Sequence, residues 1–218
     1  MGNLVFGQQA LPTLAIEADT ARYEVRRIFC VGRNYAEHAL EMGNAVDRSA
    51  PFYFTKSPFA VLTDGADFPY PPETQDCHHE MEFVVALSDD GIFGYACGLD
   101  MTRRDLQAIA KEKRRPWDVA KDFEHSAILG ALTPAERFGD IGHQAISLRV
   151  NGETRQNATL DTMIHSVPAI LQDLAKFYTL GAGDIIMTGT PAGVGPVQRG
   201  DTMVGSIDGL RDLVVNVV

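Results

Sequence analysis

Residues 80–88 alternate in part between polar and hydrophobic residues and then become apolar, and this pattern is the clearest structural signal in the chain. The even positions carry Glu80, Glu82, Val84 and Ala86, and the odd positions carry Met81, Phe83, Val85 and Leu87. A period of two places each set on its own face of a β-strand. Asp89-Asp90-Gly91 is a turn signal, and a second apolar stretch runs from about Ile92 to Asp100. The pattern therefore predicts a β-hairpin.

Strand signals also dominate the rest of the chain. The expected strands are Arg27–Val31, Pro51–Thr55, Ala60–Leu62, 146–150 and 185–187, with a hairpin turn at Asn151-Gly152. The expected helices run from about Tyr35 to Met42, from Thr102 to about Lys113, and from Ser166 to about Leu180. Many strands with few helices predict an α+β fold around a folded-over mixed sheet. Residues 1–25 are expected to form a short N-terminal segment, including strands, packed on a single domain of residues 26–218.

Composition limits the classes of protein that fit. The chain has 218 residues, 45% of them hydrophobic, and a formal net charge of −10. That charge argues against nucleic-acid partners, which need a basic face. No apolar run approaches the roughly 18 residues that cross a bilayer, and no signal peptide is visible, so a cytoplasmic location without membrane contact is expected. The three cysteines lack a C-x-x-C spacing and are expected to be buried free thiols.

Two glutamates on one strand face suggest a metal site. Side by side, the carboxylates of Glu80 and Glu82 would repel each other, and a hard divalent cation with oxygen ligands would relieve the repulsion. If Asp89-Asp90-Gly91 is a three-residue loop, Ser88 pairs with Ile92 and Asp100 lies opposite Glu80 on the same face. A shift by one residue would turn Asp100 away. A solvated acidic strand face remains the alternative.

Other catalytic motifs do not fit. The sequence around His79 and Glu80 is not an H-E-x-x-H zinc site, because Phe83 holds the last position. A zinc deaminase would need a P-C-x-x-C motif, which does not follow His78. The chain also lacks the G-x-S-x-G motif of hydrolases with a serine nucleophile.

A candidate general base lies on the first expected helix. His38 and Glu41 are three residues apart, so their side chains can touch, and a carboxylate that binds an imidazole raises its basicity. Lys56 and Lys121 stand among apolar or aromatic residues. Each of these observations also fits an ordinary surface side chain.

Five ordered motifs resemble the fumarylacetoacetate hydrolase family, in its acylpyruvate hydrolase-like branch. They are Val31–His38, His79–Glu82, Gly98–Gln107, Ala120–Phe123 and Met187–Gly195. The resemblance implies a mixed β-roll or sandwich core of the type found in that family's C-terminal domain, with a few short helices. It also implies a homodimer that binds Mg²⁺ or Mn²⁺.

The same resemblance implies roles for individual residues. The implied metal ligands are Glu80, Glu82 and Asp100; the implied catalytic residues are His38, Glu41 and Lys121. The implied substrate-binding residues are Arg33, Lys56, Arg104, Gln107 and Thr190. Arg103, Asp122 and Ile128 depart from the family's pattern, and Asp122 could alter the charge near Lys121.

The function implied is metal-dependent hydrolysis of the C–C bond of 2,4-diketo acids, acylpyruvates such as fumarylpyruvate, to pyruvate and a carboxylic acid. Oxaloacetate decarboxylation or keto–enol tautomerisation at the same metal site is the main alternative. A metal-stabilised binding protein without turnover is a third, and a positioned base argues against it.

Overall fold

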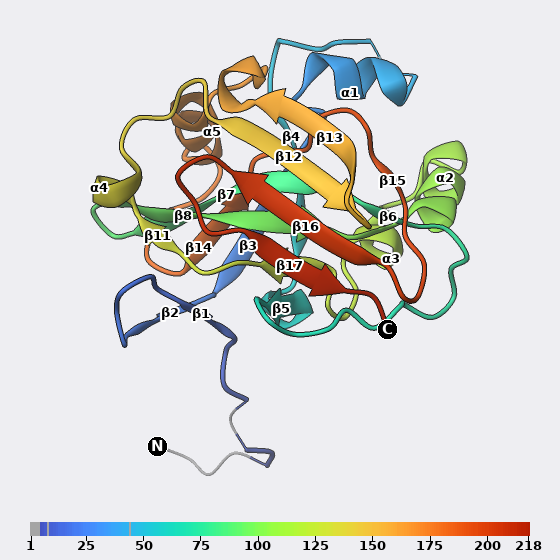
Figure 1. Cartoon of the computed structure of the whole chain (residues 1–218). Helices are drawn as coiled ribbons and strands as arrows, with labels where there is room; N and C mark the ends of the chain where they lie inside the picture. The colour runs from blue at the N-terminus through green and yellow to red at the C-terminus, as the bar shows by residue number, and fades with distance from the viewer. Residues whose placement is uncertain (1–4, 8, 44) are drawn as a thin grey trace.

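Two β-sheets packed face to face form the centre of the molecule, shown by a computed structural model that describes residues 5–7, 9–43 and 45–218. The larger sheet has the order β4-β3-β14-β7-β8-β10-β5, with β11 paired to β8. The smaller has the order β13-β12-β16-β17 and lies in front of the larger one in Figure 1. Parallel pairs, β3 with β14 and β5 with β10, sit among antiparallel ones. This is the mixed α+β sandwich that the sequence predicts.

The strands have the following bounds. The larger sheet consists of β3 (Arg27–Gly32), β4 (Phe52–Lys56), β5 (Val61–Thr63), β7 (Met81–Ser88), β8 (Gly91–Asp100), β10 (Ala127–Leu129), β11 (Thr133–Pro134) and β14 (Asp184–Met187). The smaller sheet consists of β12 (Ala145–Val150), β13 (Glu153–Thr159), β16 (Thr202–Ile207) and β17 (Leu213–Asn216). Two minor sheets are formed by β1 (Thr13–Ala15) with β2 (Arg22–Glu24), and by β6 (Cys77–His79) with β9 (Thr102–Arg103) and β15 (Gly195–Pro196).

The helices are short and lie at the edges of the sheets (Figure 1). They are α1 (Ala36–Glu41), α2 (Arg104–Glu112), α3 (Asp118–Lys121), α4 (Ala135–Phe138) and α5 (Val167–Leu174), with 3₁₀ turns at Pro58–Ala60 and Leu160–Thr162. The helix expected to reach Leu180 ends at Leu174, because the backbone tightens there into i to i+3 bonds such as Phe177 N–H to Leu174 C=O. No helix in the described residues has both the length and the apolar character of a membrane span.

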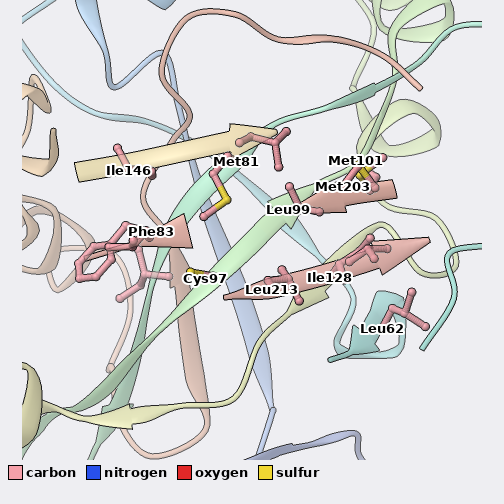
Figure 2. Close-up of a cluster of buried hydrophobic side chains, with 14 of the residues drawn as sticks. Leu62, Met81, Phe83, Cys97, Leu99, Met101, Ile128, Ile146, Met203 and Leu213 are labelled. Carbon is pink, nitrogen blue, oxygen red and sulfur yellow. The ribbon is translucent and has the colours of Figure 1, made fainter. Parts of the chain in front are cut away.

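The two faces of the larger sheet bury separate hydrophobic clusters. Met81, Phe83 and Leu99 point toward Ile146 and the smaller sheet (Figure 2). On the opposite face, Val84 and Ala86 pack with residues of the β1-β2 hairpin. The alternation read from the sequence is therefore correct, and it places Glu82 on the same face as Val84.

The hairpin of β7 and β8 reaches the expected register by a different route. The prediction of a three-residue loop is wrong, because Ser88 pairs with Gly91 and leaves a two-residue turn. A bulge between Ala86 and Leu87 then inserts one extra residue, Phe93, into β8. Met81 consequently pairs with Leu99, as the longer loop would have given, and Asp100 N–H donates to Glu80 C=O at 2.9 Å.

Tyr23 joins the N-terminal hairpin to the sheet. Its buried hydroxyl lies 2.7 Å from Leu87 C=O and accepts hydrogen bonds from the N–H groups of Leu87 and Gly183 at 3.1 and 3.0 Å. Burial raises the pKa of Tyr23 to about 12, so the hydroxyl stays protonated and can donate.

We expect Tyr23→Phe to lower the free energy of unfolding by about 1–3 kcal/mol, because buried backbone groups would lose their partner. Urea unfolding followed by circular dichroism measures the change. Tyr178→Phe is the matched control, since the Tyr178 ring packs on Phe29 while its hydroxyl has no hydrogen-bond partner among the described residues. Equal effects of the two substitutions would contradict the proposed role of the Tyr23 hydroxyl.

Candidate active site

Three carboxylates meet where β6, β7 and β8 come together. Glu80 lies between β6 and β7, Glu82 lies in β7, and Asp100 ends β8. One oxygen of each lies within 4.8 Å of the others, and all three side chains are buried. An all-oxygen cluster of this size suits a hard divalent cation, so these residues could hold a metal ion.

The ammonium group of Lys121 lies among two of these carboxylates. Its Nζ is 2.7 Å from Glu80 Oε2, 2.6 Å from Asp100 Oδ2 and 2.7 Å from Thr102 Oγ1. Burial favours the neutral amine, but the charges of Asp100 and Glu80 outweigh it and raise the pKa of Lys121. The lysine therefore remains a fixed positive charge beside the cluster.

Two further cationic side chains, Lys56 and Arg104, offset the negative charge of Asp100 and Glu80. Lys56 Nζ lies 2.8 Å from Asp100 Oδ1, and its side chain is completely buried. Arg104 forms an ion pair with Glu80 Oε1 and donates to Gln107 Oε1 at 2.6 Å. Burial raises the pKa of Glu80, but the charges of Lys121 and Arg104 prevail and hold it below its usual range.

Glu82, unlike Glu80 and Asp100, is not paired with a cationic side chain in the described part of the chain. It has no ion pair among the described residues and accepts one hydrogen bond, from Gly189 N–H at 2.8 Å. Burial and the negative charges of Asp100 and Glu80 raise the pKa of Glu82 well above its ordinary value. A divalent cation between the three side chains would supply the missing positive charge, so the residues present fit a metal ion.

The predicted histidine–glutamate pair faces the carboxylates. His38 Nδ1 lies 3.3 Å from Glu41 Oε2, and His38 lines the same pocket as the triad. Burial lowers the pKa of His38 against the opposing charges of Glu80 and Glu41. The imidazole is therefore uncharged at neutral pH, and with Nδ1–H directed at Glu41 its Nε2 can accept a proton.

The loop after β14 binds the carboxylates of both Glu82 and Glu41. Gly189 N–H binds Glu82, and Gly193 N–H donates to Glu41 Oε1 at 3.0 Å. Both glycines have positive φ angles, +99° and +94°, and a Cβ at Gly193 would lie 2.0 Å from Arg155 O. Only glycine fits such positions without strain, which explains the glycines of the T-G-T-P-A-G sequence.

Gln156, in β13 of the smaller sheet, is a site residue that the sequence analysis missed. It is buried, its Oε1 accepts from Met81 N–H at 3.0 Å, and its Nε2 donates to Thr190 Oγ1 at 2.7 Å. Because Thr190 accepts this bond, its own hydroxyl hydrogen remains available to a ligand. No local motif marks Gln156, since its partners lie 34 and 75 residues away.

The structure brings most of the remaining predicted residues to one pocket. Arg33, Arg104, Gln107, Lys121 and Thr190 line it together with the triad. Lys56 lies behind Asp100 and does not line it. Six further lining residues were not predicted as site residues from the sequence: Val31, Gly32, Met42, Phe54, Lys111 and Trp117.

Comparisons with known proteins find relatives over most of the chain. The family model described as fumarylacetoacetate (FAA) hydrolase C-terminal matches residues 27–218. A fumarylpyruvate hydrolase of a Ralstonia species is 44% identical over 190 residues, covering 81% of this chain and 98% of the relative. Oxaloacetate tautomerases of Escherichia coli (strain K12) and of human mitochondria are 39% and 40% identical, covering 86% and 88% of this chain and 90% and 91% of theirs.

A solved structure is similar over nearly the whole chain. It is a fumarylpyruvate hydrolase from Pseudomonas aeruginosa in complex with Mn²⁺ and pyruvate, with 44% identity, a TM-score of 0.95 and 99% of both chains covered.

Glu80 is paired with cationic side chains and Glu82 is not, so we expect different effects when each is replaced by glutamine. Glu80→Gln would leave Arg104 without its anion and Lys121 with only Asp100, and should destabilise the metal-free protein by about 3 kcal/mol. Glu82→Gln should leave its stability unchanged or higher, because it removes a buried carboxylate that has no ion pair. Both should weaken Mn²⁺ binding on the order of 100-fold or more.

Urea unfolding in the presence of a chelator measures stability, and calorimetric titration measures Mn²⁺ affinity. If Glu82→Gln destabilised the metal-free protein as much as Glu80→Gln, the assignment of compensating charges would be wrong. Undiminished Mn²⁺ affinity in either variant would remove that residue from the ligand set.

Proposed function

Because the chain belongs to the fumarylacetoacetate hydrolase family, we propose that it is a divalent-metal-dependent hydrolase that cleaves 2,4-diketo acids to pyruvate and a carboxylic acid. The observation that carries this proposal is the uncharged His38 imidazole, hydrogen-bonded to Glu41, in the pocket of the carboxylate triad. Hydrolysis needs a base that takes a proton from the attacking water; keto–enol tautomerisation also needs a base, for the proton on carbon, but it needs no attacking water.

Glu80, Glu82 and Asp100 would hold Mg²⁺ or Mn²⁺, with Mn²⁺ favoured by the Pseudomonas aeruginosa structure. When bound, the ion would act as a Lewis acid that polarises substrate oxygens. The triad faces three cationic side chains, so a divalent ion would make the centre net positive. This local charge would attract an anionic substrate despite the protein's net charge of −10.

The residues of the chain can carry the proton transfers. His38 Nε2, oriented by Glu41, takes a proton from water as the water oxygen bonds to the distal keto carbon of the substrate. The bond from that carbon to the adjacent CH₂ then breaks, and its electron pair passes to the CH₂ carbon as pyruvate enolate. That carbon takes up the proton from His38, giving pyruvate and the free acid.

Other side chains position the substrate. Lys121 keeps its charge beside the carboxylate triad and would stabilise negative charge that develops on a substrate bound there. Thr190, held by Gln156, would donate its hydroxyl to the substrate carboxylate. Arg104 and Gln107 line the same side of the pocket and are hydrogen-bonded to each other.

Tautomerisation or decarboxylation of oxaloacetate is the second candidate, favoured by relatives about 40% identical that are named for this tautomerisation. The same triad and Lys121 would serve it. A cytoplasmic location and a homodimer remain predictions from the sequence.

The test is to incubate chelator-treated protein with acetylpyruvate, fumarylpyruvate or oxaloacetate, with and without Mg²⁺ or Mn²⁺. Loss of enol absorbance and formation of pyruvate are followed. Metal-dependent cleavage of an acylpyruvate that is faster than oxaloacetate loss is the expected result. Turnover of oxaloacetate alone would replace the hydrolase by the second candidate, and metal binding without any turnover would indicate a binding protein.

We expect His38→Ala to lower kcat for acylpyruvate hydrolysis by a factor on the order of 10²–10⁴, with Mn²⁺ affinity unchanged because His38 is not a ligand. His143→Ala is the control, since His143 is exposed and pairs with Asp161. Steady-state kinetics and calorimetry make the measurements. Full hydrolysis by His38→Ala would remove His38 from the mechanism.

A further inference from the structure

A groove next to the carboxylate pocket has no assigned role. It is lined by residues of β4 and of the segment that leads into α3, and its volume is about 480 Å³. Four residues, Arg33, Phe54, Trp117 and Lys121, line both the groove and the carboxylate pocket. The two spaces are therefore neighbours with a shared wall, and a ligand could extend from one into the other.

The space beside the carboxylates is too small for a complete diketo acid. Its volume is about 30 Å³, enough for no more than a few water molecules. Pockets for small organic ligands usually measure about 300–1,000 Å³. The part of the substrate beyond the scissile bond must lie elsewhere, and the groove has the required volume.

Aromatic rings form the walls of the groove. The Phe52 and Phe54 rings lie 5.2 and 6.1 Å from the Trp117 ring, measured between centroids. The Phe52 side chain is 43% exposed although it is large and apolar. Flat aromatic surfaces favour a planar, conjugated chain, which can stack on them without losing torsional freedom.

Unpaired positive charge lies at the groove as well. Arg33 is positioned over the Phe52 ring at 5.7 Å and lines both spaces, whereas Arg115 lines only the groove. Across the described chain, neither guanidinium has a carboxylate partner. Asp118 also lines the groove and its negative charge partly offsets them. Exposed arginines without partners can bind a carboxylate through two parallel hydrogen bonds.

On the basis of the proposed hydrolase function, we infer that this groove is the acyl-binding subsite and that Arg115 is a specificity-determining residue. Its guanidinium binds a terminal carboxylate on a flat, unsaturated acyl chain that lies against the rings of Phe52 and Trp117. The chemical class of substrate is thus a 2,4-diketo acid with a second carboxylate at the far end. Acylpyruvates with short uncharged arms would not reach Arg115.

Arg115→Gln tests this inference, with fumarylpyruvate as the substrate that has a terminal carboxylate and acetylpyruvate as the one that lacks it. Arg114→Gln is the matched control, because it removes the same charge from the next position and Arg114 does not line the groove. For Arg115→Gln we expect kcat/KM for fumarylpyruvate to fall about tenfold, the loss of one exposed charge-assisted pair. The value for acetylpyruvate should stay within about twofold, and Arg115→Lys should recover part of the loss.

Equilibrium binding provides a second measurement. In a His38→Ala background with Mn²⁺ present, adding Arg115→Gln should raise the Kd for fumarylpyruvate about tenfold, measured by calorimetry, and leave that for acetylpyruvate nearly unchanged. Equal effects on both ligands, no effect on either, or the same effect from Arg114→Gln would overturn the subsite. If the wild-type protein cleaves no acylpyruvate, the hydrolase proposal itself fails. If the wild-type protein cleaves acylpyruvates but Arg115→Gln has no selective effect, only the subsite fails.

Discussion

Three carboxylates buried within 4.8 Å of one another are stable only when positive charge lies among them. At an effective dielectric constant of about 20, each such pair of negative charges repels by roughly 3–4 kcal/mol. Lys56, Lys121 and Arg104 neutralise Asp100 and Glu80, and Glu82 is left uncompensated. The positive charge that Glu82 lacks is missing at the position where a divalent cation fits. Much of the surrounding structure serves to keep these charges in place.

The two sheets provide the rigidity that this arrangement needs. Because side chains alternate along β7, one face anchors Met81, Phe83 and Val85 against the smaller sheet while the other presents Glu82. The smaller sheet also reaches the site directly, since Gln156 binds both the backbone of β7 and Thr190. A packed interior tolerates little displacement, so the ligand set and the loop after β14 are held as one unit.

The division between a small charged centre and a larger aromatic groove has consequences for specificity. In the proposed function, the centre with the triad, Lys121 and Thr190 would recognise features common to keto acids, and this fits relatives with both hydrolase and tautomerase names. The groove lies outside that shared chemistry. On the inferred role of the groove, differences between substrates would depend on residues such as Arg115, and changes there need not disturb the compensated charges of the centre.

The sequence by itself determined the alternation of β7 and the α+β class, and its ordered motifs predicted the residues that the structure brings together at the centre. These are local: a period of two, an i, i+3 pair on a helix, or a turn signal depends on neighbours in the chain. It did not determine how the β7-β8 hairpin reaches its register. The two-residue turn and the bulge at Phe93 shift the strand pairing in opposite directions, and the two shifts cancel. Only the tertiary structure decided that Lys56 lies behind Asp100, that Gln156 joins the site from the second sheet, and that Arg115 borders an aromatic groove. Those positions follow from contacts between distant segments, which no local pattern encodes.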